Sequence, residues 1–411
     1  MKKIGMFGYG TVGRGFFGLM QRNGDVVSKN AGVELEVCRV FARREFPGDP
    51  VEPFLTHRVE DLWEDDSIDI IVEVLAGVEP AYQWTKQALL AGKSVVTSNK
   101  AVVAAHGAEL ISIARQKGVS YLFEGSVGGA IPVLRTVTHG LISDHISEIW
   151  GILNGTTNYI LTEMKDKGAA FDDVLKEAQR RGYAEADPTA DVEGHDACRK
   201  LAILSSLAFG AMANYEEIHT EGISAITKED IAYGKAMGCD IKLLASAKRT
   251  ETGISALVAP SFVPKNHPLA AVQGVMNAVF IKGDMSGETM YYGPGAGEFP
   301  TASAVASDIV AAVTGVETYP GLAVEDHLVV LPRQKRKTKV FYRILVSDVE
   351  EAKKTCNEVL DVVQFVALEG VAGEIGVISG AQEEGVLGEK TNLLSKGKGI
   401  RQILSRIRME E

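Results

Sequence analysis

The sequence has few cysteines, and they form no pattern. Cys38, Cys198, Cys239 and Cys356 are scattered through the 411 residues with no CxxC or CxxH spacing. They predict neither a zinc site nor a disulfide framework, so a reducing compartment is the default. Long hydrophobic runs are also missing, since none approaches the roughly 20 residues that span a bilayer. A strand-like segment starts at the third residue, which leaves no room for a signal peptide.

Positive charge is scarce as well. The chain has 43 Lys and Arg against 54 Asp and Glu, a formal net charge of -11. Nucleic-acid binders and membrane-surface proteins need a basic face, and this composition offers only a small one. We therefore expect a cytoplasmic protein that acts on small molecules and binds neither nucleic acid nor membrane.

What is present is ordinary globular material, with 45% hydrophobic and 24% charged residues over a length that predicts two or three domains. In the first third, short apolar runs alternate with helical stretches, which is typical of a parallel sheet with helices on both faces. From about residue 130, longer helical patterns mixed with short strands predict an α+β domain. A helix of small residues at 302–314 is expected to pack back against the first domain.

The tail has a different pattern. Pro332 opens a basic run that ends at Lys339 and is interpreted as a solvated linker. Beyond it, the order strand, helix, strand, strand, helix over roughly 75 residues predicts a small ferredoxin-like module that is separable from the rest.

The segment 8–13, GYGTVG, is a GxGxxG motif between a predicted strand and a predicted helix. Gly8 permits a tight turn, Gly10 lets the backbone approach a pyrophosphate, and Gly13 allows close packing of helix on strand. The helix starts around Thr11 and Val12, where free N–H groups favour an anion. This context predicts a dinucleotide-binding Rossmann domain.

The second strand ends at Arg43 and Arg44. An acidic residue at this position binds the ribose 2′-hydroxyl of NAD, whereas arginine suits the 2′-phosphate of NADP. NADP is therefore favoured, with NAD still possible because Glu45 follows and either arginine can simply be a solvated surface residue.

Ser98 and Lys100 follow a strand in TSNKA, so they are expected at the carboxyl edge of the sheet, where open α/β folds bind ligands. The other reading of Lys100 is a solvated lysine at a helix start.

The segment 182–200 carries five carboxylates in a loop that leads into a helix. Asp196 and Lys200 are four residues apart and share one face of that helix, which continues through the apolar Ile203 and Leu207. A solvated ion pair does not align with an apolar face, so we expect this pair to be partly buried. A lysine in a partly dry cleft can act as a general acid, which suits carbonyl reduction.

Two glycine-rich stretches remain, at 124–132 and 293–297. The first is either a hinge or a source of carbonyl ligands for a hard monovalent ion beside Glu124. The second either closes over a nicotinamide or is an ordinary turn.

Taken together, these segments resemble the homoserine dehydrogenase family over roughly residues 1–330. The resemblance rests on GYGTVG at 8–13, TSNKA at 97–101, EGSVGGAIP at 124–132, ILNGTTNYIL at 152–161, GYAEADPTADVEGHDACRK at 182–200 and GPGAGEFPTASAVASD at 293–308. It implies NAD(P)-dependent interconversion of L-homoserine and L-aspartate 4-semialdehyde, in threonine and methionine biosynthesis, by a homodimer or homotetramer.

The resemblance also implies an α/β architecture with three parts. These are a Rossmann domain at 1–130 and about 300–330, a catalytic and dimerisation domain at 131–300, and an ACT-like module at 338–411. The tail departs from the usual ACT pattern, because Asp348-Val349-Glu350-Glu351 replaces Asp-x-Pro-Gly after its first strand.

Roles for individual residues follow from the same resemblance. Lys200 is the proposed proton donor to the aldehyde oxygen, Asp196 orients it, and Lys100 is a second lysine near substrate and nicotinamide. The implied substrate-binding residues are Glu185, Asp191 and Gly182. The implied cofactor contacts are Gly8, Gly10, Thr11, Val12, Gly13, Arg43, Arg44, Ser98, Lys100 and Gly297. A monovalent cation such as Na+ is implied at Glu124 and the carbonyls of Val127, Gly129 and Ile131.

Two other functions use the same framework. An aspartate-semialdehyde dehydrogenase that forms an acyl-enzyme needs a nucleophilic cysteine beside a base, and Cys198 lies inside a predicted helix without one. A non-catalytic NADPH sensor has no use for the lysine and carboxylate set.

Overall fold

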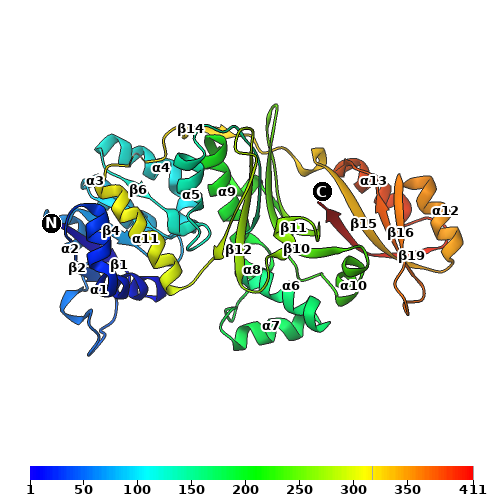
Figure 1. Cartoon of the computed structure of the whole chain (residues 1–411), viewed down its shortest axis with the longest axis horizontal. Coiled ribbons are helices and arrows are strands. Elements are labelled where there is room, and N and C mark those ends of the chain that lie inside the picture. The colour runs from blue at the N-terminus through cyan, green and yellow to red at the C-terminus, as the bar shows by residue number, and fades with distance from the viewer. Residues whose placement is uncertain (317, 411) are drawn as a thin grey trace.

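The computed structural model describes residues 1–316 and 318–410, which form three parts in a row along the long axis (Figure 1). The N-terminal domain lies at one end, the catalytic domain in the middle and the C-terminal module at the other end. Glu317 and Glu411, which the predicted domain ranges include, lie outside the described residues. No helix within the described ranges is long and apolar enough to cross a membrane.

The N-terminal domain is a six-stranded sheet in the order β3-β2-β1-β4-β5-β6 with all strands parallel. This is the order of the Rossmann fold, and the chain reverses direction across the sheet between β1 and β4. The α/β prediction is confirmed. The strands are β1 (Lys2–Phe7), β2 (Leu35–Phe41), β3 (Leu55–Thr56), β4 (Ile70–Glu73), β5 (Ser94–Thr97) and β6 (Tyr121–Leu122). The helices are α1 (Thr11–Ala31), α2 (Asp61–Glu64), α3 (Ala81–Leu90) and α4 (Lys100–Lys117).

Helix α11 (Glu298–Val313) returns from the catalytic domain and packs on α1, as its small residues predict. The approach is close at Gly15, where a Cβ atom would lie 2.6 Å from the backbone oxygen of Glu298. Only glycine fits there, so α11 is tied to the nucleotide-binding end of the first domain.

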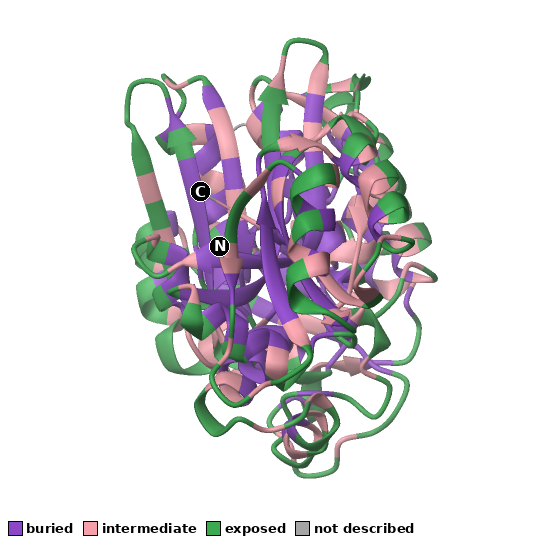
Figure 2. Ribbon diagram, turned by 90° about the vertical axis from the view of Figure 1, so that its right-hand side faces the viewer, coloured by how far each residue is buried: buried purple, intermediate pink, exposed green. Residues whose placement is uncertain are grey.

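The catalytic domain supplies the first five strands of a large mixed sheet that runs β13-β12-β7-β10-β11-β19-β15-β17-β16. Its central strands are buried, while the outer faces of the helices are exposed (Figure 2). The strands are β7 (Ile146–Ile152), β10 (Cys239–Thr250), β11 (Gly253–Pro264), β12 (Met276–Gly283) and β13 (Glu288–Pro294). The main helices are α6 (Gly155–Lys167), α7 (Phe171–Arg180), α8 (Thr189–Val192), α9 (His195–Phe209) and α10 (Lys228–Ala236). Short strands β8 (Ala211–Ala213) and β14 (Ala323–Leu328) pair with each other, and β9 (His219–Thr220) pairs with β11.

The C-terminal module contains two strands more than predicted, the short β18 and the final β19. Its elements are β15 (Lys337–Val346), α12 (Val349–Val359), β16 (Val362–Val366), β17 (Glu374–Ser379), β18 (Gln382–Glu383), α13 (Glu384–Leu394) and β19 (Ile400–Met409). The order β19-β15-β17-β16 is the ferredoxin-like arrangement. Strand β19 also pairs with β11, so one sheet runs through both parts.

The basic run connects the two parts and is mostly exposed, as the linker interpretation predicts, but it is structured and Arg336 is an exception. Residues Arg333–Lys335 form a 3-10 helix, β15 starts at Lys337, and the Arg336 side chain is only 11% exposed. Arg336 donates to the Ser246 hydroxyl and pairs with Glu410, so partners distant in sequence neutralise the run. The module also packs directly on the catalytic domain, with the Phe341 ring 5.3 Å from the Phe262 ring, and the separability of the tail stays a prediction.

Candidate active site

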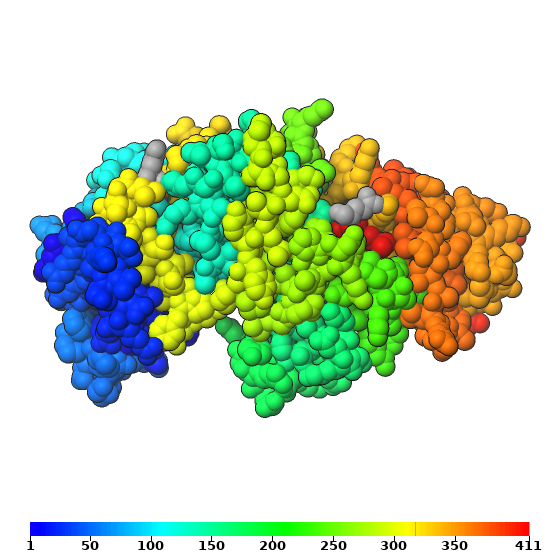
Figure 3. Space-filling view, in the orientation of Figure 1, coloured from blue at the N-terminus to red at the C-terminus, as the bar shows by residue number. Residues whose placement is uncertain are grey.

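A cleft of about 1010 Å³ lies between the N-terminal and catalytic domains. Figure 3 shows the molecular surface hollowed between the N-terminal domain and the green lobe that contains α6 and α7. Most of the predicted cofactor residues share this cleft. The predicted residues that line it are Gly8, Gly10, Thr11, Val12, Arg43, Arg44, Ser98, Lys100, Gly129, Glu185, Lys200 and Gly297.

The glycine motif has the geometry that a pyrophosphate requires. Gly8 has a φ of 102°, which side chains rarely adopt, and Gly10 caps α1 with open space around its Cα. Gly13 lies behind the cleft, where a Cβ atom would approach the Gly8 oxygen to 2.5 Å. The free N–H groups at the start of α1 therefore face the cleft without obstruction.

The two arginines after β2 are exposed on the cleft wall. The Arg44 guanidinium lies 4.9 Å from the centre of the Phe46 ring. Glu45 is held by His57, whose ring Nε2 lies 2.7 Å from its carboxylate. Glu45, the acidic residue that kept NAD possible in the sequence analysis, is therefore already paired with His57.

The two lysines that the sequence analysis singled out, Lys100 and Lys200, contact the same carboxylate. Lys200 Nζ lies 2.8 Å from one oxygen of Asp196, and Lys100 Nζ lies 3.0 Å from the other. The side chains of Lys200 and Asp196 are 10% and 8% exposed, which confirms the burial expected from their helix face, whereas Lys100 is 38% exposed. Lys200 also donates to the Leu153 carbonyl at 2.8 Å, which fixes its direction.

This arrangement controls the charge of the site. Burial alone would raise the pKa of Asp196, but the ammonium groups of Lys200 and Lys100 outweigh it and hold that pKa well below its ordinary value. Asp196 in turn raises the pKa of Lys100. A carboxylate that stays ionised keeps two ammonium groups oriented at the cleft.

Asn154 is a site residue that sequence reasoning did not give a role. It is the N-cap of α6, where its side-chain oxygen accepts from the backbone N–H of Thr157. The cap turns its amide group inward, where it donates to Asp191 at 2.7 Å and to Asp196 at 2.9 Å. The signal was present in the sequence, since Asn-Gly-Thr-Thr is a capping pattern, but its second function depends on the tertiary fold.

The predicted substrate residues are not all equally close to the cleft. Glu185 is exposed and lines it, and Asp191 is half-buried beside Asn154. Burial, then the neighbouring Asp196, raises the pKa of Asp191. Gly182 lies in the turn after α7, with a φ of 76°, and is not among the described residues that line the cleft.

Glu73, at the end of β4, is a second residue that the sequence analysis missed. It is fully buried and accepts hydrogen bonds from the Thr97 hydroxyl at 2.6 Å and from the Leu75 backbone at 2.7 Å. Burial raises its pKa to about 7. The carboxylate therefore joins the carboxyl ends of β4 and β5, from which the loops to the cleft depart.

The two glycine-rich stretches touch each other at the cleft. A Cβ atom on Gly129 would lie 2.6 Å from the Gly295 backbone, and the Ala130 N–H donates to the Pro294 carbonyl at 3.2 Å. Gly297, with a φ of 130°, caps α11 at the same place. This contact connects the domain junction to the cofactor cleft.

Glu124 lies at the predicted cation site. Its two carboxylate oxygens accept backbone N–H groups from Leu134 and Arg135, at 2.8 and 2.7 Å. The carbonyl of Ile131 accepts from Val133. Each of these oxygens has a second lone pair, so the donor set of one carboxylate and several carbonyls is compatible with a hard cation.

Thiol chemistry does not fit the site. Cys198 is buried, its Sγ lies 3.3 Å from the Tyr215 carbonyl, and burial raises its pKa. A nucleophilic cysteine needs the opposite, a stabilised thiolate beside a base. The acyl-enzyme alternative is therefore disfavoured, and the cleft combines a dinucleotide cradle with an oriented lysine.

Known proteins resemble this chain in sequence and in overall fold. The family models described as homoserine dehydrogenase and as homoserine dehydrogenase, NAD binding domain, match residues 132–310 and 8–124. The homoserine dehydrogenase of Pseudomonas aeruginosa is 46% identical over 319 residues, which cover 77% of this chain and 74% of that protein. A homoserine dehydrogenase structure from Thiobacillus denitrificans is 38% identical with a TM-score of 0.92, covering 100% of this chain and 98% of that one.

A hyperthermophilic archaeal homoserine dehydrogenase, solved in complex with NADPH, is 29% identical with a TM-score of 0.68. The match covers 78% of this chain and 100% of that one. The chain thus belongs to the homoserine dehydrogenase family, NAD(P)-dependent oxidoreductases that interconvert L-homoserine and L-aspartate 4-semialdehyde.

Proposed function

We propose that Lys200 is the acid–base residue of this reaction and that Asp196, to which Lys100 also binds, keeps it in position. The observation that carries the proposal is the shared carboxylate, with Lys200 at 2.8 Å and Lys100 at 3.0 Å from Asp196. NADP(H), when bound, supplies or accepts the hydride. Lys200 donates a proton to the aldehyde oxygen in reduction and takes it back in oxidation.

Lys100 has a different task in this proposal. Its side chain is 38% exposed against 10% for Lys200, so it is better hydrated and less constrained. A positive charge at the cleft side of Asp196 stabilises the developing alkoxide electrostatically without transferring a proton. Asn154 completes the arrangement by holding Asp191 and Asp196 at a fixed separation.

We further propose that Glu185 and Asp191 hold the ammonium group of the substrate, with Gly182 shaping the loop that carries them. Glu185 lines the cleft, and Asp191 is fixed by Asn154, so both carboxylates approach the same region from one segment. Two carboxylates beside two lysines select a substrate that carries an ammonium group as well as a carbonyl or hydroxyl group.

For the cofactor, we propose a preference for NADP, with Arg43 and Arg44 binding the 2′-phosphate. Both line the cleft beside the glycine motif, and Glu45, the residue that would favour NAD, is held by His57. A relative solved with NADPH is consistent with this choice. Arginine binds phosphate through paired, charge-assisted hydrogen bonds.

Four further expectations complete the proposal. Glu124 with the carbonyls of Val127, Gly129 and Ile131 would hold a monovalent cation such as Na+, which predicts activation by added salt of that cation. The enzyme would act in the cytoplasm as a homodimer or homotetramer. The tail would be an ACT-like module.

The test is to assay L-homoserine oxidation with NADP and with NAD, and to compare the wild type with Asp196→Asn. Asparagine keeps the shape but removes the charge that both lysines share, so we expect kcat to fall by about tenfold or more while NADPH affinity is retained. A variant with wild-type kcat, folded by circular dichroism, would remove Asp196 from the proposed mechanism.

A further inference from the structure

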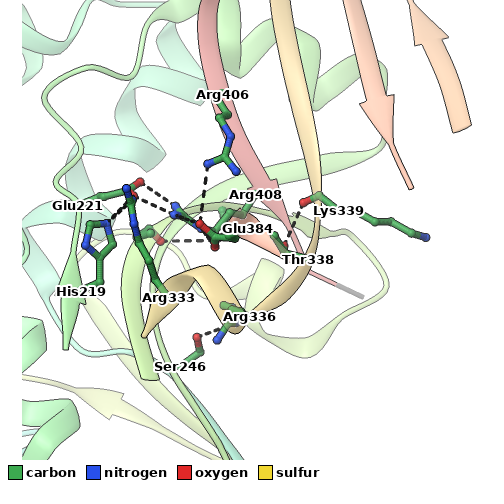
Figure 4. Close-up of polar contacts among 12 residues, drawn as sticks. His219, Glu221, Ser246, Arg333, Arg336, Thr338, Lys339, Glu384, Arg406 and Arg408 are labelled. Carbon is green, nitrogen blue, oxygen red and sulfur yellow. Dashed lines mark hydrogen bonds and ion pairs between the residues drawn. The ribbon is translucent and has the colours of Figure 1, made fainter. Parts of the chain in front are cut away.

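Residues 219–224, here called the strap, lie between the active-site turn and the C-terminal module. The strap starts in β9, beside β11, where the Glu221 N–H donates to the Val258 carbonyl at 2.8 Å. Figure 4 shows the Glu221 side chain pointing toward Arg408 and Arg333.

On the active-site side, the strap is hydrogen-bonded to the turn that precedes α9. The Ile223 N–H donates to the Val192 carbonyl at 2.8 Å, and the Ser224 hydroxyl donates to Glu193. Gly222 makes the contact close, since a Cβ atom there would lie 2.5 Å from the Val192 oxygen. Movement of the strap therefore moves the backbone at 192 and 193.

That turn determines where the catalytic carboxylates lie. Asp191 is one residue before Val192, and Gly194, with a φ of 80°, is the N-cap of α9. Asp196 and Lys200 follow on the first turns of that helix. Gly194 also contacts the strap, because a Cβ atom there would lie 3.0 Å from the Thr220 methyl group. The strap thus touches the turn on both sides of Glu193.

On the module side, Arg408 in β19 binds Glu221 with two nitrogens, at 2.7 and 2.8 Å. The same guanidinium binds Glu384 at 2.6 and 2.8 Å. Arg408 and Glu384 are 1% and 3% exposed, whereas Glu221 is 34% exposed. Arg333 adds a contact to Glu221 at 3.1 Å.

We propose that Arg408 is a positioning residue for homoserine binding, which acts by holding the strap against the turn that carries Asp191. The guanidinium is fixed from the far side by Glu384, so it is a rigid anchor rather than a mobile surface charge. Its planar fork satisfies two carboxylates at once, which the single ammonium group of a lysine does with fewer, less directional bonds. The proposal rests on the role given above to Asp191 in substrate binding.

The same joint contains a matched control. Arg343 in β15 also connects the module to the catalytic domain, through Asp230 at 3.0 Å and the Thr227 hydroxyl at 2.7 Å, and it pairs with Glu374. Its side chain is 9% exposed, so it is a comparably buried arginine with two carboxylate partners. These partners of Arg343 all lie outside the strap.

The experiment compares Arg408→Lys with Arg343→Lys in the full-length enzyme. Both remove buried contacts between a guanidinium and two carboxylates, so both should lower the thermal midpoint. We expect only Arg408→Lys to lower kcat/KM for L-homoserine, by about 10- to 100-fold and mostly through KM, since small displacements of positioning groups are costly. The KM for NADP should stay within twofold of wild type in both variants.

Equal losses of kcat/KM in the two arginine variants, or no loss in either, would overturn the proposal. If Arg408→Lys does not fold, Glu221→Gln replaces it, because Glu384 still neutralises the guanidinium in that variant. Glu221→Gln should raise the KM for L-homoserine in the same direction, and a wild-type KM would also overturn the proposal.

A further variant, Asp191→Asn, separates this inference from the proposed function on which it rests. If Asp191→Asn leaves the KM for L-homoserine unchanged, the substrate role of Asp191 is wrong. If Asp191→Asn raises that KM and Arg408→Lys does not, the substrate role stands and only the positioning role of Arg408 fails.

Discussion

The catalytic domain meets its two neighbours through joints of opposite construction. The joint with the N-terminal domain leaves a cleft of about 1010 Å³, and its Lys100 is 38% exposed. The joint with the C-terminal module is closed by a continuous sheet, and its Arg408 is 1% exposed. Charges at the open joint can bind and release small molecules, whereas those at the closed joint stay with their protein partners.

The two joints also shift the pKa of a carboxylate in opposite directions. Glu73, below the open cleft, is buried with hydrogen bonds but, among the described residues, no ion pair, and burial raises its pKa to about 7. At the closed joint, burial would also raise the pKa of Glu221, but Arg408 and then His219 outweigh it and lower that pKa to about 2. At the open joint, the pKa of Glu73 lies near neutral pH. At the closed joint, Glu221 stays ionised in its pair with Arg408.

The largest effect that we predict comes from removing the closed joint. A chain that ends at Arg333 loses β19 and β15, so it exposes the edge of β11 and the buried ring of Phe262. An exposed apolar strand edge promotes aggregation. Against the separability expected from sequence, we now predict that this truncated chain is largely insoluble or unfolded, measured by size-exclusion chromatography and circular dichroism.

The comparison would break if the truncated chain stayed monodisperse with a wild-type thermal midpoint and wild-type kcat/KM. In that case the ion pairs and the shared sheet would contribute little, and the closed joint would be only a contact between separable units.

The next effect is a pH dependence of opposite sign at the two joints. Because the folded-state pKa of Glu73 is raised from about 4.5 to about 7, the unfolded chain loses its proton first as pH rises. The contribution of Glu73 is therefore present below pH 4.5 and is lost as pH rises to 7, with a size on the order of 3 kcal/mol. Glu73→Gln should flatten this decline in the free energy of unfolding, measured by urea denaturation.

Glu221 provides the matched test with the other sign. Its folded-state pKa is lowered to about 2, so its contribution is present above pH 4.5 and is lost as pH falls toward 2. Glu221→Gln should remove stability at pH 7 and converge with wild type in acid. The same pH response in Glu73→Gln and Glu221→Gln would contradict the distinction between the joints.

The smallest predicted effect lies on the cleft wall. Replacing both Arg43 and Arg44 by alanine should raise the KM for NADPH about tenfold, near 1.4 kcal/mol, and leave the KM for NADH almost unchanged. Both residues are exposed, so we expect little change in thermal stability. Steady-state kinetics with the two nucleotides measures this, and equal changes for both would exclude binding of the 2′-phosphate.

The difference between the joints also explains what the sequence could predict. The nucleotide end was predictable because GYGTVG needs only its own strand and helix to act. The pairing of Asp196 with Lys200 follows from one turn of α9. The position of Lys100 on the same carboxylate could not be predicted in this way, because it depends on the contact between α4 and α9 in the tertiary structure.

The closed joint was not predictable for a related reason. In β19, the spacing of Ile400, Ile403 and Ile407 imitates a helical period, and register shifts in its pairing with β15 disturb the alternation of a strand. The basic run before it has the composition of a linker. The positions of Arg333 and Arg336 in this run depend on their partners Glu221 and Glu410, which lie far away in the sequence and cannot be identified from composition.

The most direct test of the central claim is kcat for Lys200→Ala and Lys100→Ala, measured side by side with L-homoserine and saturating NADP. Because Lys200 is the buried, doubly held ammonium group, its loss should lower kcat by about 10²- to 10⁴-fold, and the loss of Lys100 should cost less. NADPH affinity should survive the Lys200 change, since the glycine motif lies at the other end of the cleft. A folded Lys200→Ala enzyme within about threefold of wild-type kcat, with a larger loss in Lys100→Ala, would contradict the account and move the proton transfer to Lys100.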